Sequence, residues 1–302
     1  MIDAVTPEGD GFMLNHDAHL ACEAPDPPET ITGVGGGGRH ELGSIWNPGC
    51  GPRPETTFAA TVTVAKPIAI GGTLYNPGDT FTPELNVPFI VDAKRGISTA
   101  WNTSAQVDCL ATAEGQEFVI RYYVRTVSTE LPEKRLGLQE AARISNTGMS
   151  IGVVFQQRAR LPEDFSREYG IRDGEYAYNY ALFDIGQPAR TAIYFAVDFD
   201  ATDAQIAGVI TEYFEGVLQG FNNVSQNDPI YDIGVYSSGA VCNALLSSGH
   251  VRSTWLALAT GWRGRNTFLQ WNVKQSSGET ACGLKSQELN ISRGDFGQFQ
   301  LQ

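Results

Sequence analysis

The stretch TAIYFAVDFDATDAQIAGVITEYF, residues 191–214, sets the fold expected of this chain. Its first ten residues are an apolar run rich in β-branched and aromatic side chains, which predicts a buried strand that ends in Asp198 and Asp200. The residues that follow open an amphipathic helix, and Thr202 or Asp203 is its expected N-cap. A strand that leads directly into a helix is one βα unit of a parallel sheet.

Further apolar runs repeat this alternation between residues 96 and 292. The eight predicted strands are 96–101, 117–124, 149–156, 191–200, 231–237, 253–260, 267–275 and 286–292, and the predicted helices are 136–148, 173–186, 202–221 and 238–249. The connection GWRGRN, residues 261–266, leaves no room for a helix. We therefore predict an α/β fold with an irregular eight-stranded TIM-like barrel. A doubly wound open sheet is the alternative, although no strand is followed by the GxGxxG of nucleotide-binding folds.

The barrel segment, residues 95–302, is preceded by two segments of different composition. Residues 1–55 are loop-rich, with PEGDG, APDPPET and the glycine run between Gly33 and Gly38, which predicts an arm that is flexible or ordered by a partner. Residues 56–94 contain short runs of β-formers separated by Gly-Gly and Asn-Pro-Gly turns, which predicts a small β module.

Charge and hydropathy limit the partners of this chain of 302 residues. It has 21 Lys and Arg against 34 Asp and Glu, a net charge of −13, which argues against nucleic acid and anionic lipid as partners. We expect no membrane span, because no run approaches the roughly 20 apolar residues that a transmembrane helix needs. The start MIDAVTPEGDGFM lacks the basic and apolar regions of a secretion signal, so we expect synthesis in the cytoplasm and delivery by another route.

The cysteines and histidines give no clear metal or cofactor signal. The five cysteines, Cys22, Cys50, Cys109, Cys242 and Cys282, are too sparse for a disulfide scaffold and lack the CxxC spacing of a zinc site. Either most are ordinary thiols or one or two bridges form, with Cys22 and Cys50 the natural pair in the N-terminal segment. His16 and His19 lie in a polar loop without suitably placed carboxylates, so we expect no metal and no cofactor.

The candidate chemistry lies at the end of the fourth predicted strand. In an α/β barrel the reactive groups lie at the carboxyl ends of the strands. Residues two apart on a strand share a face, so Asp198 and Asp200 are expected to point into the barrel mouth with Cα atoms roughly 6.6 Å apart. Two carboxylates this close raise the pKa of at least one of them, as a glycosidase requires. The alternative is that Asp200 only caps the next helix.

Several segments together resemble a known family. In order they are GISTAWNT, FVIRYY, SIGVVFQ, IYFAVDFDATDAQIAGVITEYF, YDIGVYSSGAVCNAL, TWLALATGW, WNVKQ and ELNISRGDFG. They are similar to the glycoside-hydrolase-like barrel family that is related to glycoside hydrolase family 25 lysozymes, over about residues 96–302. The resemblance implies a barrel that cleaves the peptidoglycan glycan between N-acetylmuramic acid and N-acetylglucosamine.

The resemblance also assigns roles to single residues. In the D-x-E of the fourth strand, Asp198 corresponds to the Asp that assists the substrate acetamido group, and Asp200 stands in place of the Glu that is the general acid. Asp200 is one methylene shorter, and a misplacement of about 1 Å can cost on the order of a hundredfold in rate. Ser98 stands where the G-[IF]-D pattern of the first strand has its Asp. Glu288 and Asn290 correspond to the last strand's D-x-N and are expected to position water or sugar.

Aromatic side chains near strand ends offer surfaces on which sugar rings stack. The candidates are Tyr122, Tyr236, Trp262 and Trp271, although most aromatic residues in a barrel belong to its core. Arg121 on the second strand has a structural alternative, a pair with a barrel carboxylate.

Three hypotheses follow. The first is a muramidase-type glycoside hydrolase directed at peptidoglycan or another cell-surface glycan. The second is a catalytically degenerate barrel that binds glycan or has a structural role, which Ser98 and Asp200 favour. The third concerns context: the protein is part of a phage tail or similar injection particle and binds its other proteins through residues 1–94.

Overall fold

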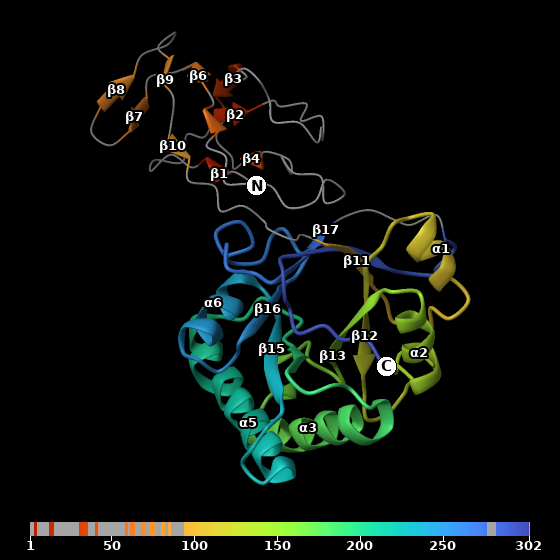
Figure 1. The fold of residues 1–302 in the computed structure, drawn as a ribbon. Coiled ribbons are helices and arrows are strands. Elements are labelled where there is room, and N and C mark those ends of the chain that lie inside the picture. Colours follow the sequence, from red (N-terminus) through yellow and green to blue (C-terminus); the bar gives the residue numbers. More distant parts are fainter. Residues whose placement is uncertain are drawn as a thin grey trace. The chain divides into compact units, whose positions relative to one another are not determined.

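The chain divides into two compact units, Met1–Asp92 and Ala93–Gln302. The computed structural model describes residues 94–276 and 282–301 and, in the first unit, the backbone of a set of short strands (Figure 1). These strands are β1 (Asp3–Ala4), β2 (Phe12–Leu14), β3 (Thr30–Gly35), β4 (His40–Glu41), β5 (Phe58–Ala59), β6 (Thr61–Thr63), β7 (Ile68–Ile70), β8 (Thr73–Tyr75), β9 (Thr80–Phe81) and β10 (Glu84–Leu85).

Strand pairing in the first unit joins the two N-terminal segments. A four-stranded sheet has the order β2-β3-β6-β9, in which β3 pairs with β2 antiparallel and with β6 parallel. Strands from residues 1–55 and 56–94 thus share one sheet, whereas the sequence predicts a loop-rich arm before a separate module. The strand β3, TITGVG, has four β-branched residues in a glycine-rich stretch, and in the prediction the loop-like composition around it outweighs this short signal.

The second unit is a closed barrel, as the sequence predicts (Figure 1). Its strands, in spatial order, are β11 (Lys94–Ser98), β12 (Phe118–Tyr123), β13 (Ser150–Phe155), β14 (Thr191–Ala196), β15 (Tyr231–Ser237), β16 (Ser253–Leu256), β17 (Val273–Ser276) and β18 (Glu288–Ser292). The strands from β11 to β17 are parallel, and β18 closes the barrel antiparallel to both β17 and β11. The closure excludes the open sheet, because β11 has a partner on each side.

Helices lie outside the ring of strands (Figure 1). They are α1 (Val107–Thr112), α2 (Leu138–Asn146), a short 3-10 turn η2 (Pro162–Asp164), α3 (Arg167–Asn179) continuing into η3 (Tyr180–Ile185), α4 (Asp203–Gln205) continuing through η4 (Ile206–Ile210) into α5 (Thr211–Ser225), and α6 (Gly239–Ser247). Residues 257–272, between β16 and β17, contain no helix, as predicted. Helix α1 was not predicted, because it is six residues long and buries only Val107 and Leu110. No helix in the described ranges is long and apolar enough to cross a membrane.

Helices α3 and α5 pack unusually closely because glycines line their contact. A Cβ atom at Gly170 would lie 2.0 Å from the carbonyl oxygen of Tyr213, and one at Gly216 would lie 2.2 Å from that of Arg167. Helix α3 begins earlier than predicted, because the side chain of Ser166 caps it by accepting a hydrogen bond from the backbone N–H of Tyr169 at 3.1 Å.

The C-terminal segment packs against the amino ends of the barrel strands. The backbones of Phe299 and Ile151 exchange hydrogen bonds of 2.7 and 2.9 Å, and the Tyr194 hydroxyl donates to the carbonyl of Phe296 at 2.8 Å. Phe296 also packs its ring against that of Phe118, with centroids 4.8 Å apart. Apolar side chains fill this end of the barrel. The partly exposed polar side chains described below lie at the other end, where the barrel strands have their carboxyl ends.

Candidate functional site

Four half-exposed side chains meet at the carboxyl ends of the strands. Tyr122 lies near the end of β12, Tyr236 near the end of β15, and Asp198 two residues beyond β14. Glu288 is the first residue of β18, and the reversed direction of that strand places it opposite Ser98, the last residue of β11. The charges of Asp198 and Glu288 both raise the pKa of Tyr122 and of Tyr236, beyond the rise that burial causes. We call these four side chains the mouth cluster.

A chain of hydrogen bonds through the barrel interior holds Glu288. Ser98 Oγ donates to Glu288 Oε2 at 2.9 Å, and Asn290 Nδ2 donates to Ser98 Oγ at 3.1 Å. Trp255 Nε1 in turn donates to Asn290 Oδ1 at 2.9 Å. Ser98 and Asn290 are 0% and 2% exposed, so they orient Glu288 from the barrel interior and are not accessible at the carboxyl ends of the strands. Burial raises the pKa of Glu288, the Ser98 hydrogen bond lowers it, and the charge of Asp198 raises it.

Asp198 lies among polar and cationic groups. Its Oδ2 accepts a hydrogen bond from Gln156 Nε2 at 3.1 Å and forms an ion pair with Arg160 Nε at 3.5 Å. Burial raises the pKa of Asp198, and the positive charges of Arg160 and Lys134 oppose that rise. Lys134 Nζ donates to the side chain of Gln156 at 3.1 Å and lies 4.7 Å from the ring centroid of Tyr122. Burial, with the nearby charge of Arg160, lowers the pKa of Lys134 to about 8.

Asp200 takes a different direction from the one that the sequence predicts. Strand β14 ends at Ala196, four residues earlier than predicted, so the alternation of a strand does not carry Asp198 and Asp200 onto one face. Asp200 Oδ1 accepts from the backbone N–H of Arg263 at 3.0 Å and lies 3.8 Å from its Nε. Asp200 therefore fastens the connection between β16 and β17.

The helix start next to Asp200 has its own cap. Thr202 Oγ1 accepts from the Gln205 backbone N–H at 3.3 Å, and the Gln205 side chain accepts from the Thr202 backbone N–H at 2.8 Å. This capping box makes Thr202 the N-cap and leaves Asp200 free to bind Arg263. Asp203 binds the same arginine at 2.8 Å.

The predicted aromatic residues are not all brought together. Tyr236 belongs to the mouth cluster, with its hydroxyl donating to Gln275 Oε1 at 3.1 Å and its ring against Trp255. Trp262 lies in the connection between β16 and β17 beside Arg263. Trp271 is buried at the amino end of β17, where the guanidinium of Arg293 covers its ring at 3.7 Å from the centroid. That position is at the opposite end of the barrel, away from the mouth cluster.

Arg121 has the structural role that the sequence analysis left open. It forms a buried ion pair with Glu140 of α2, with Nε 2.7 Å from Oε1, and both side chains are almost fully buried. The pairing carboxylate comes from a helix and not from a barrel strand, because Arg121 and Tyr122 point to opposite sides of β12.

Sequence reasoning missed four polar partners of this site, Gln156, Gln275, Lys134 and Arg160. Gln156 and Gln275 end the third and seventh predicted strands, so the rule that places reactive groups at strand ends could have found them. Lys134 lies in the loop between β12 and α2, and no sequence pattern indicates that it reaches Gln156.

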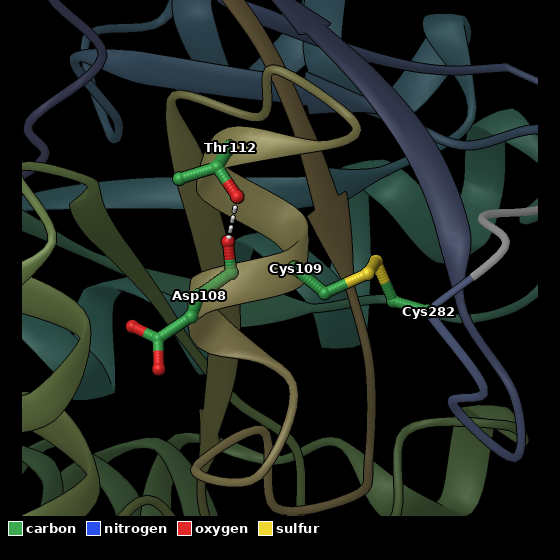
Figure 2. Close-up of a disulfide and its surroundings, with 4 residues drawn as sticks. All are labelled: Asp108, Cys109, Thr112 and Cys282. Carbon is green, nitrogen blue, oxygen red and sulfur yellow. Dashed lines mark hydrogen bonds between the residues drawn. A yellow bond between two sulfur atoms is a disulfide. The ribbon is translucent and has the colours of Figure 1, made fainter.

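A disulfide joins Cys109 of α1 to Cys282, in the segment that leads into β18 (Figure 2). The two Cα atoms are 5.8 Å apart although 173 residues separate them along the chain. The bond fastens the segment before Glu288 to the first helix of the barrel. Cys242 is buried on α6, and burial raises the pKa of its thiol, which makes it unreactive. Cys22, Cys50, His16 and His19 lie outside the described residues.

A closed βα barrel with two partly buried carboxyls at the carboxyl ends of its strands defines a protein of the glycoside-hydrolase-like class. The chain belongs to the family of Rv2525c-like, glycoside hydrolase-like domains, whose sequence profile matches residues 108–293. This match confirms the resemblance seen in the sequence.

Several known proteins are similar to this chain in sequence or in structure. The uncharacterized protein YbfG of Bacillus subtilis (strain 168) is 32% identical over 155 residues, which cover 50% of this chain and 21% of that protein. The chain therefore spans only about a fifth of the length of this relative. The Tat-secreted protein Rv2525c of Mycobacterium tuberculosis, in complex with L-tartrate, has a TM-score of 0.57 at 20% identity over 68% of this chain and 98% of that one. A family 25 glycosyl hydrolase from Bacillus anthracis has a TM-score of 0.43 at 10% identity over 67% of this chain and 89% of that one.

Proposed function

We propose that the barrel is a glycoside hydrolase acting on a cell-surface glycan such as peptidoglycan, with Glu288 as proton donor and Asp198 as its ionised partner. The observation that carries the proposal is the pair itself, two half-exposed carboxyls with raised pKa values beside two tyrosines at the open end of the barrel. Glycoside hydrolysis requires one carboxyl that keeps its proton and one that is ionised. Membership of a glycoside-hydrolase-like family supports the reaction class.

The surroundings of the two carboxyls support this division of roles. Asp198 has Arg160 at 3.5 Å, and the charge of Lys134 further favours its ionised form. Glu288 has no cationic partner among the described residues, and the charge of Asp198 raises its pKa. Cations beside one carboxyl and a negative charge beside the other favour the ionised form of the first and the protonated form of the second. When the glycosidic bond breaks, Glu288 gives its proton to the leaving oxygen and Asp198 stabilises the positive charge that develops on the sugar. A water molecule then bonds to the anomeric carbon and gives a proton back to Glu288.

The tyrosines and the buried residues have supporting roles in this proposal. Tyr122 and Tyr236 offer ring faces and hydroxyls beside the two carboxyls, where a sugar ring binds. Ser98 and Asn290 act as positioning residues, since they hold Glu288 from the barrel interior. Asp200 binds Arg263 and so holds the connection between β16 and β17, which carries Trp262; it is not the proton donor.

A second function, glycan binding without hydrolysis, is favoured by one observation. Ser98 stands where the resemblance implies an Asp, and the side chain of Asp200 is held by Arg263. The barrel then keeps its tyrosines and polar groups for binding, while one implied carboxylate is replaced by Ser98 and another is held by Arg263.

Release of new reducing ends from purified peptidoglycan tests the two functions. We expect Glu288→Gln and Asp198→Asn to lower the rate on the order of a hundredfold to ten-thousandfold, the usual contribution of a general acid or base. Asp203→Asn is the matched control, because this carboxylate is 91% exposed and, within the described part of the chain, its side chain binds Arg263 alone. Loss of activity in Asp200→Asn with full activity in Glu288→Gln would overturn the assignment of Glu288. Glycan binding by the unmodified chain without release of reducing ends would support the second function.

We also propose that the barrel works outside a reducing cytoplasm. The disulfide between Cys109 and Cys282 supports this location, because such bonds persist in oxidising compartments. The Mycobacterium tuberculosis protein of the same fold is described as Tat-secreted, which agrees with it. Mass spectrometry of unreduced peptides from the natural source is the test, and a free thiol at both cysteines would contradict the location.

The route of delivery is proposed to be an assembled particle, such as a phage tail, bound through residues 1–94. The support is architectural: a separate unit of short paired strands precedes a barrel of the glycoside-hydrolase-like class. Co-purification of the full chain with particle proteins, lost on deletion of residues 1–92, is the expected result. Purification from its natural source without any bound protein would count against this route.

A further inference from the structure

Two adjoining cavities, of about 400 and 350 Å³, open beside the mouth cluster. Their walls share Thr126, Gln156, Gln157, Arg158 and Asp164. They lie at the carboxyl ends of β12 and β13, between the loops that follow these two strands. We call this pair of cavities the β12–β13 groove.

The groove is positive in a chain that is strongly negative. Five cations line it, Arg125, Lys134, Arg158, Arg160 and Arg172, against two carboxylates, Asp164 and Asp173. The chain as a whole carries a net charge of −13. Clefts lined by one sign of charge concentrate ligands of the opposite sign, so this groove attracts anions despite the acidic surface around it.

Both carboxylates of the groove are already occupied. Asp173 forms ion pairs with Arg125 at 3.0 Å and with Arg172 at 3.4 Å. Asp164 accepts hydrogen bonds from the backbone N–H groups of Arg160 and Leu161, at 3.0 and 3.1 Å. Arg160 pairs in addition with Asp198 of the mouth cluster, so the five cations stand against three carboxylates and the groove keeps a positive excess.

Arg158 is the cation best placed for such a ligand. It lines both cavities and is exposed, and its guanidinium makes no hydrogen bond or ion pair with the residues that the structure describes. A guanidinium presents a planar fork of N–H donors that matches a carboxylate or a phosphate with two parallel hydrogen bonds. Lys134 and Arg160 lie in the wall of the smaller cavity.

The groove is continuous with the proposed catalytic residues. Gln156 lines both cavities and donates to Asp198 at 3.1 Å, and Arg160 of the smaller cavity pairs with the same carboxylate at 3.5 Å. A ligand whose sugar lies over the mouth cluster therefore extends its substituents into the groove. The two cavities are too small for a long polyanion such as nucleic acid, and the chain is too acidic to bind one. A short anionic group is therefore the favoured ligand.

We propose that the β12–β13 groove binds an anionic substituent, a carboxylate or a phosphate, of the glycan that occupies the mouth cluster. The link to the mouth cluster rests on the proposed function, whereas anion binding in the groove stands without catalysis. The groove then selects acidic glycans over neutral ones, and Arg158 is its specificity-determining residue.

Binding to three soluble probes of equal length tests this proposal with the full chain in calorimetry. The probes are a neutral chitin oligosaccharide, an oligosaccharide in which alternate sugars carry a carboxylate, and one in which they carry a phosphate. We expect at least one anionic probe to bind about fivefold or more tightly than the neutral one, the factor of one charge pair about 4 Å apart in water. The preference should fall as salt rises, and the tighter anionic probe identifies the source of the charge.

Arg158→Gln is the decisive variant. It removes one charge from an exposed position that has no partner in residues 94–276 and 282–301, so the fold of the barrel is kept, and thermal unfolding checks this. We expect the anionic probe to lose about fivefold in affinity and the neutral probe to be unaffected. Arg190→Gln is the matched control, because Arg190 is an exposed arginine at the amino end of β14, where the same charge change lies at the opposite end of the barrel.

The outcomes separate this proposal from the proposed function. Equal binding of neutral and anionic probes, or an Arg158→Gln variant with unchanged preference, overturns the groove proposal even where the chain releases reducing ends. A preference for anionic probes that Arg158→Gln removes, in a chain without hydrolysis, supports the groove and refutes only the catalytic role.

Discussion

Replacing Ser98 with alanine tests whether Glu288 is the proton donor. Ser98 Oγ donates to Glu288 Oε2 at 2.9 Å, and its own lone pair is taken by Asn290 Nδ2 at 3.1 Å. The hydroxyl hydrogen is therefore directed at the carboxyl, where it favours the ionised form and lowers the pKa of Glu288. Alanine removes this donor without changing any charge.

The expected shift follows from the strength of that bond. A hydrogen bond to a charged group contributes about 1.5–3 kcal/mol, and one pKa unit corresponds to about 1.4 kcal/mol. Only the difference between a hydrogen bond to the ionised carboxyl and one to the protonated carboxyl moves the pKa, so we expect Ser98→Ala to raise the pKa of Glu288 by about one unit. A proton donor works while it is protonated, so the alkaline limb of kcat/KM against pH should move upward by the same amount.

The assay is the pH profile of reducing-end release from peptidoglycan. Ser253→Ala is the control, because Ser253 is another buried barrel serine, at the amino end of β16, and it should leave the profile unchanged. An alkaline limb that stays in place, or moves to lower pH, in a folded Ser98→Ala variant would refute the role of Glu288 as donor.

Stability gives a second measurement that does not depend on activity. The pKa of Glu288 is raised on folding, so its contribution to stability is present below its unfolded pKa and is lost as pH rises through the folded pKa. Because Ser98→Ala raises the folded pKa further, the variant should lose more stability near pH 7 than near pH 4. Urea unfolding at the two pH values measures this difference, and an equal loss at both would contradict it.

Three further predictions concern the fold. Gly170→Ala should lower the free energy of unfolding by about 1–3 kcal/mol, because a Cβ there would lie 2.0 Å from a backbone oxygen of α5, and thermal unfolding would measure it. Reduction of the disulfide between Cys109 and Cys282 should cost about 2–4 kcal/mol in denaturant unfolding, and equal midpoints with and without reductant would contradict this. Glu140→Gln should cost about 3–5 kcal/mol, because it leaves the charge of Arg121 buried without its partner; a Tm unchanged from that of the unmodified chain would refute it.

Local patterns predict the barrel strands and leave the arrangement of the site open. Each barrel strand was predicted near its observed position, because burial on a parallel sheet requires a continuous apolar run that is visible in a few residues. The end of β14 was misplaced by four residues, since nothing in AVDFDA indicates where ladder hydrogen bonds stop. Because β14 ends earlier than predicted, Asp198 and Asp200 do not share one face of a strand. The proposed proton donor is therefore Glu288 and not Asp200.

The sequence by itself determined the class of fold, the family and Asp198 as a candidate, because these depend on short-range periodicity and on a specific local motif. Only the tertiary structure decided that Glu288, 90 residues away, lies close enough to Asp198 for its pKa to be raised by that charge, since this follows from the antiparallel direction of β18 and the closure of the barrel. The same holds for the disulfide across 173 residues and for the positive groove, whose cations come from separate loops and a helix. Contacts between distant residues depend on where whole strands and helices lie, and no local pattern contains that information.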